Sequence, residues 1–351
     1  MAAYTTIDDP EAYFQIVLWT GDGGSSRSIT LGGENDMQPD LVWSKQRVNT
    51  YNHFVWDSAR GAGAEKELVM NIENAEGAVD MATYGYMSSF DSNGFSIAAG
   101  STNSDYLNKS SKTYVAWCWK ESADAGFDIV TYDGTGSART ISHSLSAVPH
   151  VMMAKQREDP GGGSNSWNMY HHKNTSAPNT DYLTINENSA TADSNIRWND
   201  TTPTSSVFTV GTGNSVNQDG VAHLMYLFSE KQGFSKFGSY TGNGNADGPF
   251  VYTGLLPAFI LIKNTGASED WWLMDNKREG FNSATSNRGN FALQPNSNSA
   301  ENTNQQADFL SNGFKLRATS AEVNSSGVAY VYMAFAEAPF VNSNGVPCNA
   351  R

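Results

Sequence analysis

Tyr114-Val115-Ala116-Trp117-Cys118-Trp119 is an aromatic segment in which larger and smaller side chains alternate. A segment of the same kind starts 109 residues later, as His223-Leu224-Met225-Tyr226-Leu227-Phe228, and another starts 107 residues after that, as Tyr330-Val331-Tyr332-Met333-Ala334-Phe335. Because side chains alternate between the two faces of a strand, we expect both tryptophans to lie on one face, in a core, and Cys118 to point to the other. A fixed internal period of this kind decides the architecture before any local assignment does.

Other landmarks recur around this strand in the same order. Each copy starts with a Gly-x-Gly turn: Trp19-Thr20-Gly21-Asp22-Gly23, Tyr132-Asp133-Gly134-Thr135-Gly136 and Tyr240-Thr241-Gly242-Asn243-Gly244. A proline, five mostly apolar residues and a lysine follow, at residues 39–45, 149–155 and 257–263. Next comes an aromatic strand, with Asp57 and Arg60 in the first copy, His171 in the second and Asp275 and Arg278 in the third. A Phe-centred strand precedes the closing strand, and the second copy keeps only residues 207–210 of it.

These offsets predict an all-β chain made of three tandem β-sandwiches of the jelly-roll or lectin-like kind, each about 110 residues long. We place the three domains at residues 1–122, 123–234 and 235–351 and expect them to follow one another as beads on a string. The proline-to-lysine segments are continuous apolar runs, which is typical of strands that are covered on both faces or lie close to a neighbouring domain. The best helical candidate is residues 62–78, although its glycines argue against a long helix.

Composition limits the classes of partner. The chain has 36 acidic and 22 basic residues, a formal net charge of −14. A protein that binds nucleic acid through phosphates needs the opposite balance or a basic stripe, and the sequence has neither, so we expect no nucleic-acid partner. The charge is uneven: 8 basic and 16 acidic residues in the first copy, 6 and 11 in the second, 8 and 9 in the third, hence −8, −5 and −1. This gradient suggests different neighbours at the two ends, or drift among solvated surfaces.

The longest apolar run, residues 255–262, is far shorter than the ~20 residues that cross a bilayer, so we expect no membrane insertion. Acidic residues at positions 8, 9 and 11 stand where a Sec-type export signal needs a basic start, so we expect no such signal. Cys118 and Cys348 are read as two free thiols, with Cys118 on a strand.

Few residue patterns point to chemistry. His171 and His172 are adjacent, and neighbours on a strand face opposite ways, so they are poorly placed to share a metal. The exchange of Asp57, His171 and Asp275 between copies suggests a surface position. The Gly-x-Gly turns are read as plain β-turns, with calcium binding as the alternative. Paired carboxylates for glycoside hydrolysis are spatial and leave no pattern in a sequence. We predict no enzyme and no catalytic, cofactor or metal residues, with any binding on the polar loops at residues 158–166 and 282–308, unless these are disordered tips.

Several segments resemble a family of repeat proteins encoded by marine bacteriophages, notably cyanophages and phages of other abundant ocean bacteria. The resemblance rests on residues 1–15, 19–23, 38–45, 56–61, 89–97 and 114–120. It is closest over residues 1–120 and weakens through the two later copies. Members of this family are described as virion structural or tail-fibre-like proteins, with no established catalytic or metal residues to carry over.

The resemblance implies a virion component assembled in the host cytoplasm, with other tail or capsid proteins as partners. We favour a surface fibre, spike or tail-associated adhesin that contacts host surface polysaccharide, because several outward domains raise avidity without new chemistry. The alternatives are an architectural capsid-decoration or tail-adaptor protein without receptor binding and, less favoured, a glycan depolymerase. Phage fibres are commonly homotrimers, and three tandem copies would also supply threefold-like surfaces within one chain, so the sequence leaves the oligomeric state open.

Overall fold

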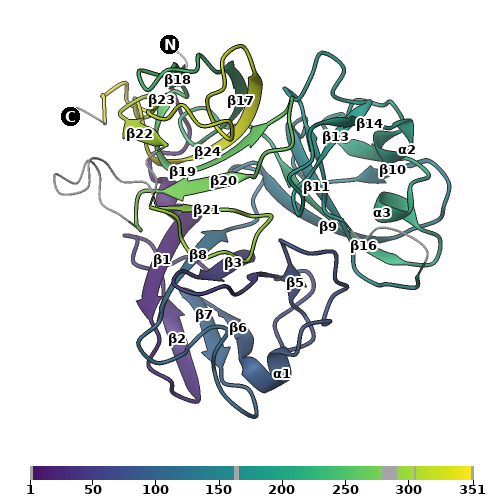
Figure 1. Ribbon diagram of the computed structural model, residues 1–351, viewed down its shortest axis with the longest axis vertical. Helices are drawn as coiled ribbons and strands as arrows, with labels where there is room; N and C mark the ends of the chain where they lie inside the picture. The colour runs from purple at the N-terminus through teal and green to yellow at the C-terminus, as the bar shows by residue number, and fades with distance from the viewer. Residues whose placement is uncertain (1–2, 162–165, 279–290, 304–305, 349–351) are drawn as a thin grey trace.

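The computed structural model describes residues 3–161, 166–278, 291–303 and 306–348, and these form an almost entirely β structure of three lobes (Figure 1). We call the lobes repeats 1, 2 and 3. The domain boundaries placed at 122/123 and 234/235 fall in the connections between β8 and β9 and between β16 and β17. All strand pairs in the described part of the chain are antiparallel. Among the described residues no helix has the length and apolar character needed to cross a membrane.

Repeat 1 contains a large and a small sheet. The large sheet has the order β1 (Phe14–Thr20), β8 (Thr113–Trp119), β3 (Leu41–Gln46), β4 (His53–Asp57) and β5 (Leu68–Val69), and the small sheet has β2 (Ser26–Thr30), β7 (Gly94–Ala98) and β6 (Tyr86–Asp91). A 3₁₀ turn at Pro10–Ala12 precedes β1, and helix α1 (Met81–Tyr84) precedes β6. The helical candidate at residues 62–78 is wrong, because it forms turns and the short strand β5.

Repeat 2 follows the same plan with a smaller second sheet. Its large sheet has the order β14 (Ala192–Asp193), β13 (Asp181–Thr184), β12 (Asn168–His171), β11 (Val151–Gln156), β16 (Ala222–Phe228) and β9 (Phe127–Asp133). Its small sheet pairs β10 (Arg139–Ser142) with β15 (Val207–Val210), and helices α2 (Asn195–Trp198) and α3 (Asn214–Asn217) flank β15. The weak Phe-centred landmark of the second copy thus corresponds to a sheet of two strands.

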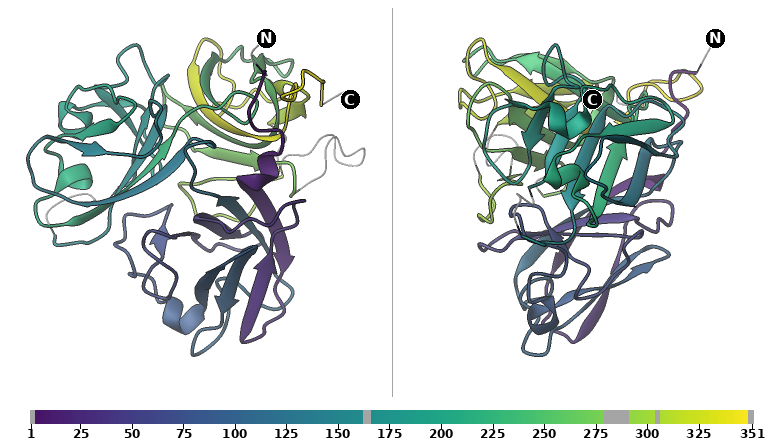
Figure 2. Two further views of the ribbon diagram at one scale, coloured as in Figure 1. Left: turned by 180° about the vertical axis from the view of Figure 1, so that it is seen from behind. Right: turned by 90° about the vertical axis from the view of Figure 1, so that its right-hand side faces the viewer.

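Repeat 3 returns to the arrangement of repeat 1. Its large sheet has the order β17 (Ser235–Thr241), β24 (Ala329–Pro339), β19 (Leu255–Asn264), β20 (Trp272–Asp275) and β21 (Ala292–Leu293), and its small sheet has β18 (Phe250–Tyr252), β23 (Gly313–Leu316) and β22 (Ala307–Leu310). The N-terminal segment crosses to this repeat, where both chain ends lie (Figure 2). There the backbone N–H of Ser343 donates to the Asp8 carboxylate at 2.7 Å.

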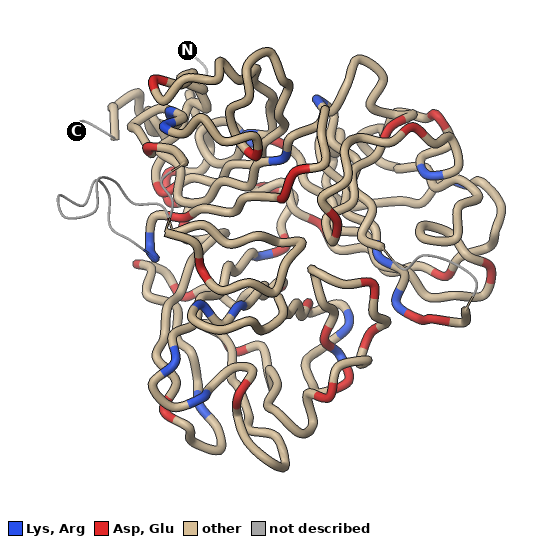
Figure 3. The backbone as a smooth tube through the Cα atoms, viewed as in Figure 1, with Lys and Arg blue, Asp and Glu red and all other residues tan. Residues whose placement is uncertain are grey.

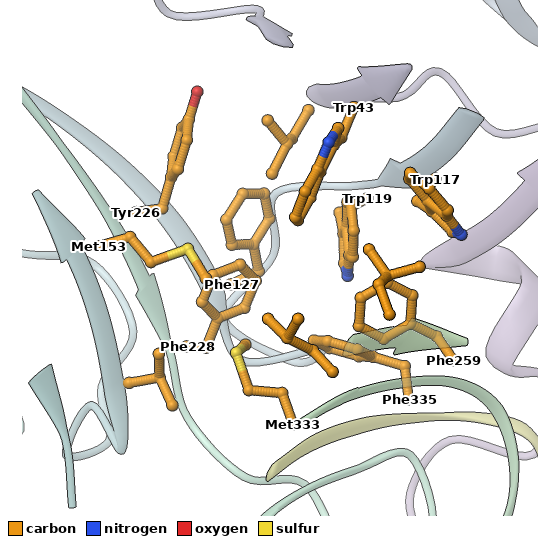
Figure 4. Packing of buried hydrophobic residues seen from close by; sticks show 14 of the residues in the cluster. Trp43, Trp117, Trp119, Phe127, Met153, Tyr226, Phe228, Phe259, Met333 and Phe335 are labelled. Atoms are coloured by element: carbon orange, nitrogen blue, oxygen red, sulfur yellow. The ribbon is translucent and has the colours of Figure 1, made fainter. Parts of the chain in front are cut away.

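The central strands β3, β11 and β19 of the large sheets are buried on both faces, as their apolar proline-to-lysine segments predict. One face packs against the repeat's own small sheet, and the other packs into a single hydrophobic cluster shared by all three repeats. In β8, Trp117 and Trp119 join the shared cluster while Cys118 joins the sandwich core of repeat 1, so the predicted alternation is confirmed. Figure 4 shows the shared cluster, to which the labelled Trp43, Trp117, Trp119, Phe127, Met153, Tyr226, Phe228, Phe259, Met333 and Phe335 belong.

The shared cluster corrects the expectation of beads on a string. Separate domains each bury their own core, whereas here side chains of all three repeats exclude water from one another. The sequence predicts that the strands are covered on both faces, but alternation alone does not say which element covers the second face.

Equivalent hydrogen bonds close the three repeats into a ring. The backbone N–H of Glu76 in repeat 1 donates to the Arg157 carbonyl of repeat 2 at 2.8 Å. The backbone N–H of Thr191 in repeat 2 donates to the Thr265 carbonyl of repeat 3 at 3.0 Å. The backbone N–H of Glu301 in repeat 3 donates to the Arg47 carbonyl of repeat 1 at 2.8 Å. Each repeat therefore uses one surface toward the preceding repeat and a different surface toward the following one, which is a heterologous contact that closes after three steps.

Side chains repeat the same cyclic pattern. The indole N–H of Trp167 in repeat 2 donates to the Val69 carbonyl of repeat 1 at 2.8 Å, and that of Trp271 in repeat 3 donates to the Thr184 carbonyl of repeat 2 at 2.9 Å. In repeat 1 the equivalent position, next to β4 residue Phe54, is His53, which is fully buried. Two tryptophans and a histidine thus occupy the equivalent position, and His53 Nδ1 accepts from the Trp43 indole N–H of its own repeat at 3.0 Å. The sequence repeats do not reveal this equivalence.

The lysines that end the apolar strands are buried in the fold. Lys155 donates to the Glu73 carbonyl of repeat 1 at 3.1 Å, and Lys263 donates to the Asn188 carbonyl of repeat 2 at 3.1 Å, so both cross a junction. Lys45 donates to Gln46 within its own repeat at 2.6 Å. Burial lowers the pKa of Lys155 and of Lys45 to about 7, because the charged form loses its hydration.

A buried asparagine organises each Gly-x-Gly turn. The side-chain oxygens of Asn108, Asn217 and Asn324 accept from the backbone N–H of the middle residue of the turn at 3.2, 3.0 and 2.9 Å. The first glycine lets that asparagine loop approach, because a Cβ on Gly242 would stand 2.3 Å from the Ser325 carbonyl oxygen. The turn and its asparagine partner are 81 residues apart in repeat 3, and the sequence repeats alone did not pair them.

Gly242→Ala is expected to lower the free energy of unfolding by about 3 kcal/mol, because the added methyl group overlaps a fixed backbone carbonyl. Chemical denaturation followed by tryptophan fluorescence measures the change. Gly32→Ala is the matched control, since a Cβ there meets nothing within 4 Å, and its effect should stay within about 0.5 kcal/mol. Equal effects of the two substitutions would show that the close approach is not what requires glycine.

Candidate functional site

The exchanged positions Asp57, His171 and Asp275 lie at the junctions between repeats. The prediction of a surface position is wrong: all three residues are buried. Where the residue changes from aspartate to histidine, the group that it contacts in the neighbouring repeat changes as well.

Two of the junctions carry buried ion clusters. In repeat 1, Asp57 binds the Arg60 guanidinium at 2.6 Å, and the Tyr226 hydroxyl of repeat 2 donates to the same carboxylate at 2.7 Å. Glu76 lies 3.4 Å from Arg60 and 2.5 Å from Arg157 of repeat 2. The cluster thus joins two carboxylates and two guanidinium groups across the junction.

The junction between repeats 3 and 1 repeats this design. Asp275 binds Arg278 at 2.6 Å and accepts from the indole N–H of Trp117 in repeat 1 at 3.0 Å. Glu301 lies 3.6 Å from Arg278 and 2.6 Å from Arg47 of repeat 1. The strand register makes Trp117 equivalent to Tyr226.

The junction between repeats 2 and 3 is neutral at the same positions. His171 replaces the aspartate and hydrogen-bonds the Tyr332 carbonyl at 3.1 Å, while Met333, which has no hydrogen to donate, replaces the tryptophan or tyrosine. The Thr191 hydroxyl donates to the Asn174 side-chain oxygen at 2.7 Å. These two residues stand where the other two junctions have a glutamate and an arginine. Donor and acceptor have changed together, so the His171 ring, the Thr191 hydroxyl and the Asn174 side-chain oxygen are paired without charge, while the buried Asn174 side-chain nitrogen has no hydrogen-bond partner among the described residues.

Beside this neutral junction lies a cleft of about 490 Å³, which we take as the candidate site. Repeat 2 contributes His150 and Glu230, repeat 3 contributes residues 235–236 and 252–254, and the N-terminal segment contributes Tyr4. The Tyr4 hydroxyl donates to the Gly254 carbonyl at 2.8 Å. Its volume is in the range of small-ligand sites.

Glu230 is the central charged group of the cleft. Its carboxylate accepts from Lys236 at 2.8 Å and from the backbone N–H of Phe237 at 2.9 Å. His172 stands 3.7 Å from it. Because Lys236 balances Glu230, the cleft presents a donor and an acceptor side by side with no excess charge.

Burial disfavours the charged form of the two histidines around the cleft. His150 Nδ1 accepts from the Glu230 backbone N–H at 3.1 Å, which leaves its other ring nitrogen as the donor. His172 Nε2 donates to the Phe237 carbonyl at 2.6 Å, and the two rings pack edge to face at 4.5 Å. Burial lowers the pKa of both imidazoles.

His171 makes this junction sensitive to acid. Its Nδ1 accepts from the Lys173 backbone N–H at 3.1 Å, a bond that protonation removes. Burial lowers the pKa of His171 to about 3. A folded-state pKa below the unfolded value near 6.5 means that the unfolded chain binds more protons, so the stability contributed by neutral His171 is lost as the pH falls below 6.5.

We therefore expect the stability difference between the wild type and His171→Gln to shrink by about 2–3 kcal/mol between pH 6.5 and 4.5. The comparison with a variant is needed because Glu121, whose pKa is raised to about 7 mainly by burial, acts in the opposite direction over this range. Urea unfolding at several pH values measures both proteins. Parallel pH profiles would contradict the assignment.

The remaining sequence candidates fall as follows. Both cysteines are free thiols and Cys118 lies on strand β8, as predicted; Cys118 is buried and Cys348 is exposed. Asp22 accepts from the Gly24 N–H and from the Asn108 side chain, both at 2.7 Å, which is a local turn arrangement. Among the described residues no three His, Cys, Asp or Glu side chains are grouped to hold a metal ion. Parts of the two predicted binding loops, residues 162–165, 282–290 and 304–305, lie outside the described residues.

Charged residues are dispersed over all three lobes (Figure 3). Residues 9–339 match the family described as a domain of unknown function (DUF7483). The match runs from the turn before β1 to the end of β24 and therefore takes in all three repeats. No curated protein matches the chain.

Proposed function

Because the chain belongs to the DUF7483 family over all three of its repeats, we propose that the three sandwiches act together as one unit. The proposed identity of that unit is a structural component of a bacteriophage virion. The favoured role is a surface fibre, spike or tail-associated adhesin that contacts host surface glycan. The resemblance to marine phage virion proteins over residues 1–120 is the basis for this assignment.

One observation carries the proposal furthest: the three large sheets share one core, so the three small sheets lie on the outside of the ring. Their outer strands are exposed, with β2, β10 and β18 each turning alternate residues to solvent. A rigid body with outward faces suits repeated weak contacts, which add through effective concentration. Such a role requires no catalytic residues.

Purified virions and the isolated protein test the proposal together. We expect the protein in the virion proteome and on the particle surface by immunogold labelling, and we expect the isolated protein to bind host cells. Absence from purified virions would refute the virion assignment. Presence in the particle without host-cell binding would favour the architectural alternative, and release of reducing ends from host envelope would favour the depolymerase.

A further inference from the structure

Repeat 3 differs from its two siblings on the outward face of one edge strand. Phe250 and Tyr252 of β18 are 46% and 55% exposed, with Val251 buried between them. The strand registers pair Val251 with Phe314, Ile29 with Phe95 and Ile141 with Phe208, which makes these three inward-facing residues equivalent; Val251 and Ile29 are buried and Ile141 is partly buried. The exposed neighbours of Ile29 and Ile141 are serine and threonine only: Ser28, Thr30, Thr140 and Ser142.

The fold does not require aromatic side chains at these two positions. Repeats 1 and 2 build the same strand with small hydroxyl residues, and exposed aromatic residues side by side are unfavourable in water. Aromatic residues that a sibling repeat does without point to a binding role for repeat 3.

Tyr252 also forms a wall of the cleft between repeats 2 and 3, so the aromatic face and the cleft form one continuous surface. Tyr4 lies next to Tyr252 and is fixed by its bond to the Gly254 carbonyl. Gln232, His150 and the Glu230–Lys236 pair supply polar groups to the same cleft. Aromatic faces therefore lie beside a set of mixed donors and acceptors.

The polar groups select the class of ligand. The 2.8 Å pair of Lys236 and Glu230 is balanced, so it favours neither an anion nor a cation. It offers a donor and an acceptor to groups that both donate and accept, as vicinal hydroxyls do, and Gln232 offers the same combination in one amide. The flat, weakly polar faces of Tyr and Phe rings suit the C–H face of a sugar ring.

We propose that the cleft between repeats 2 and 3 and the outward face of β18 together bind an uncharged saccharide chain. Side chains two apart on a strand are about 7 Å from one another, so Phe250 continues the surface from Tyr252 along the sheet edge. The ligand is accordingly a chain of several sugars rather than a monosaccharide. This site deepens the proposed function and rests on it for the source of the ligand, a glycan of the host surface.

An array of uncharged and acidic oligosaccharides, followed by calorimetric titration of the hits, tests the site with the full chain. The test variant is Phe250→Thr with Tyr252→Ser, which copies Thr140 and Ser142 of repeat 2 and so keeps residues that this strand already tolerates. The matched control is Val48→Thr, which removes exposed apolar surface in repeat 1, away from the cleft. Both should unfold at the wild-type temperature.

We expect at least one uncharged oligosaccharide to bind, the double variant to weaken its binding tenfold or more, and the control to leave it unchanged. Gln232→Ala in the cleft should weaken the same binding. The proposal is overturned if no uncharged oligosaccharide binds, if only acidic ones bind, or if the double variant binds as the wild type does.

The two proposals fail in different ways. A protein that is absent from virions but binds uncharged saccharides through Tyr252 refutes the virion assignment and leaves the site standing. A virion protein whose host-cell binding is unaffected by the double variant keeps its function and loses this site. Loss of host-cell binding without any saccharide binding would point to a protein receptor and overturn the saccharide class.

Discussion

Phe335→Ala is expected to lower the free energy of unfolding by about 3–5 kcal/mol and to do so in one transition of the whole chain. Phe335 lies where the three repeats meet: its ring packs on Phe14 and Trp119 of repeat 1 at 5.2 and 5.6 Å and on Phe228 of repeat 2 at 5.9 Å. Within repeat 3 it also contacts Phe259. Removing it opens a cavity lined by all three repeats.

Calorimetry distinguishes this shared core from three separate ones. With a shared core, unfolding stays a single transition that moves as a whole to lower temperature. Phe314→Ala, in the sandwich core of repeat 3 alone, is the matched control because it deletes the same atoms from a core that belongs to one repeat. If Phe335→Ala shifted one of several transitions and left the others in place, the repeats would be independent after all.

The second large effect is expected at the junction of repeats 1 and 2. Asp57→Ala should cost about 3–5 kcal/mol, because it leaves the Arg60 guanidinium, which has no exposed surface, without its closest carboxylate. It also removes the acceptor of the buried Tyr226 hydroxyl. Urea denaturation measures the loss.

Repeat 2 supplies a control for this prediction. Asp57→His combined with Arg60→Asn imports the neutral pair His171 and Asn174 and removes both charges together. The Glu76–Arg157 pair remains balanced across the junction. The double variant should therefore be more stable than Asp57→Ala, although it carries one more substitution. A double variant less stable than the single one would show that the unpaired charge is not the main cost.

Much of the fold could be predicted from the sequence because strand alternation and the repeat period are local or directly comparable signals. The placement of Trp117, Cys118 and Trp119 follows from alternation alone. The shortened Phe-centred landmark of copy two was visible in the sequence, but its two-stranded small sheet is known only from the structure. The shared core could not be predicted, because a buried face looks the same whether it packs on its own domain or on a neighbour.

The junctions were misjudged for a related reason. The change from Asp57 to His171 resembles tolerance at a surface when it is considered alone. It is compensated by the change from Tyr226 to Met333, and those two residues become comparable only once the strand registers are known. The arginines three residues after Asp57 and Asp275 were the available signal for a buried ion pair. The aromatic residues of β18 likewise stand out only beside their equivalents in β2 and β10.

The ring closes between repeat 3 and repeat 1 through the same backbone contact and the same ion cluster as between repeats 1 and 2, yet no peptide link joins β24 to β1 there. Covalent continuity is therefore not what holds neighbouring repeats together. We expect the two fragments of a chain nicked between β8 and β9 to stay associated. We also expect a circular permutant that begins at repeat 2 to form the same three junctions between repeats. The order of the repeats along the polypeptide therefore has little influence on how the three repeats pack against one another.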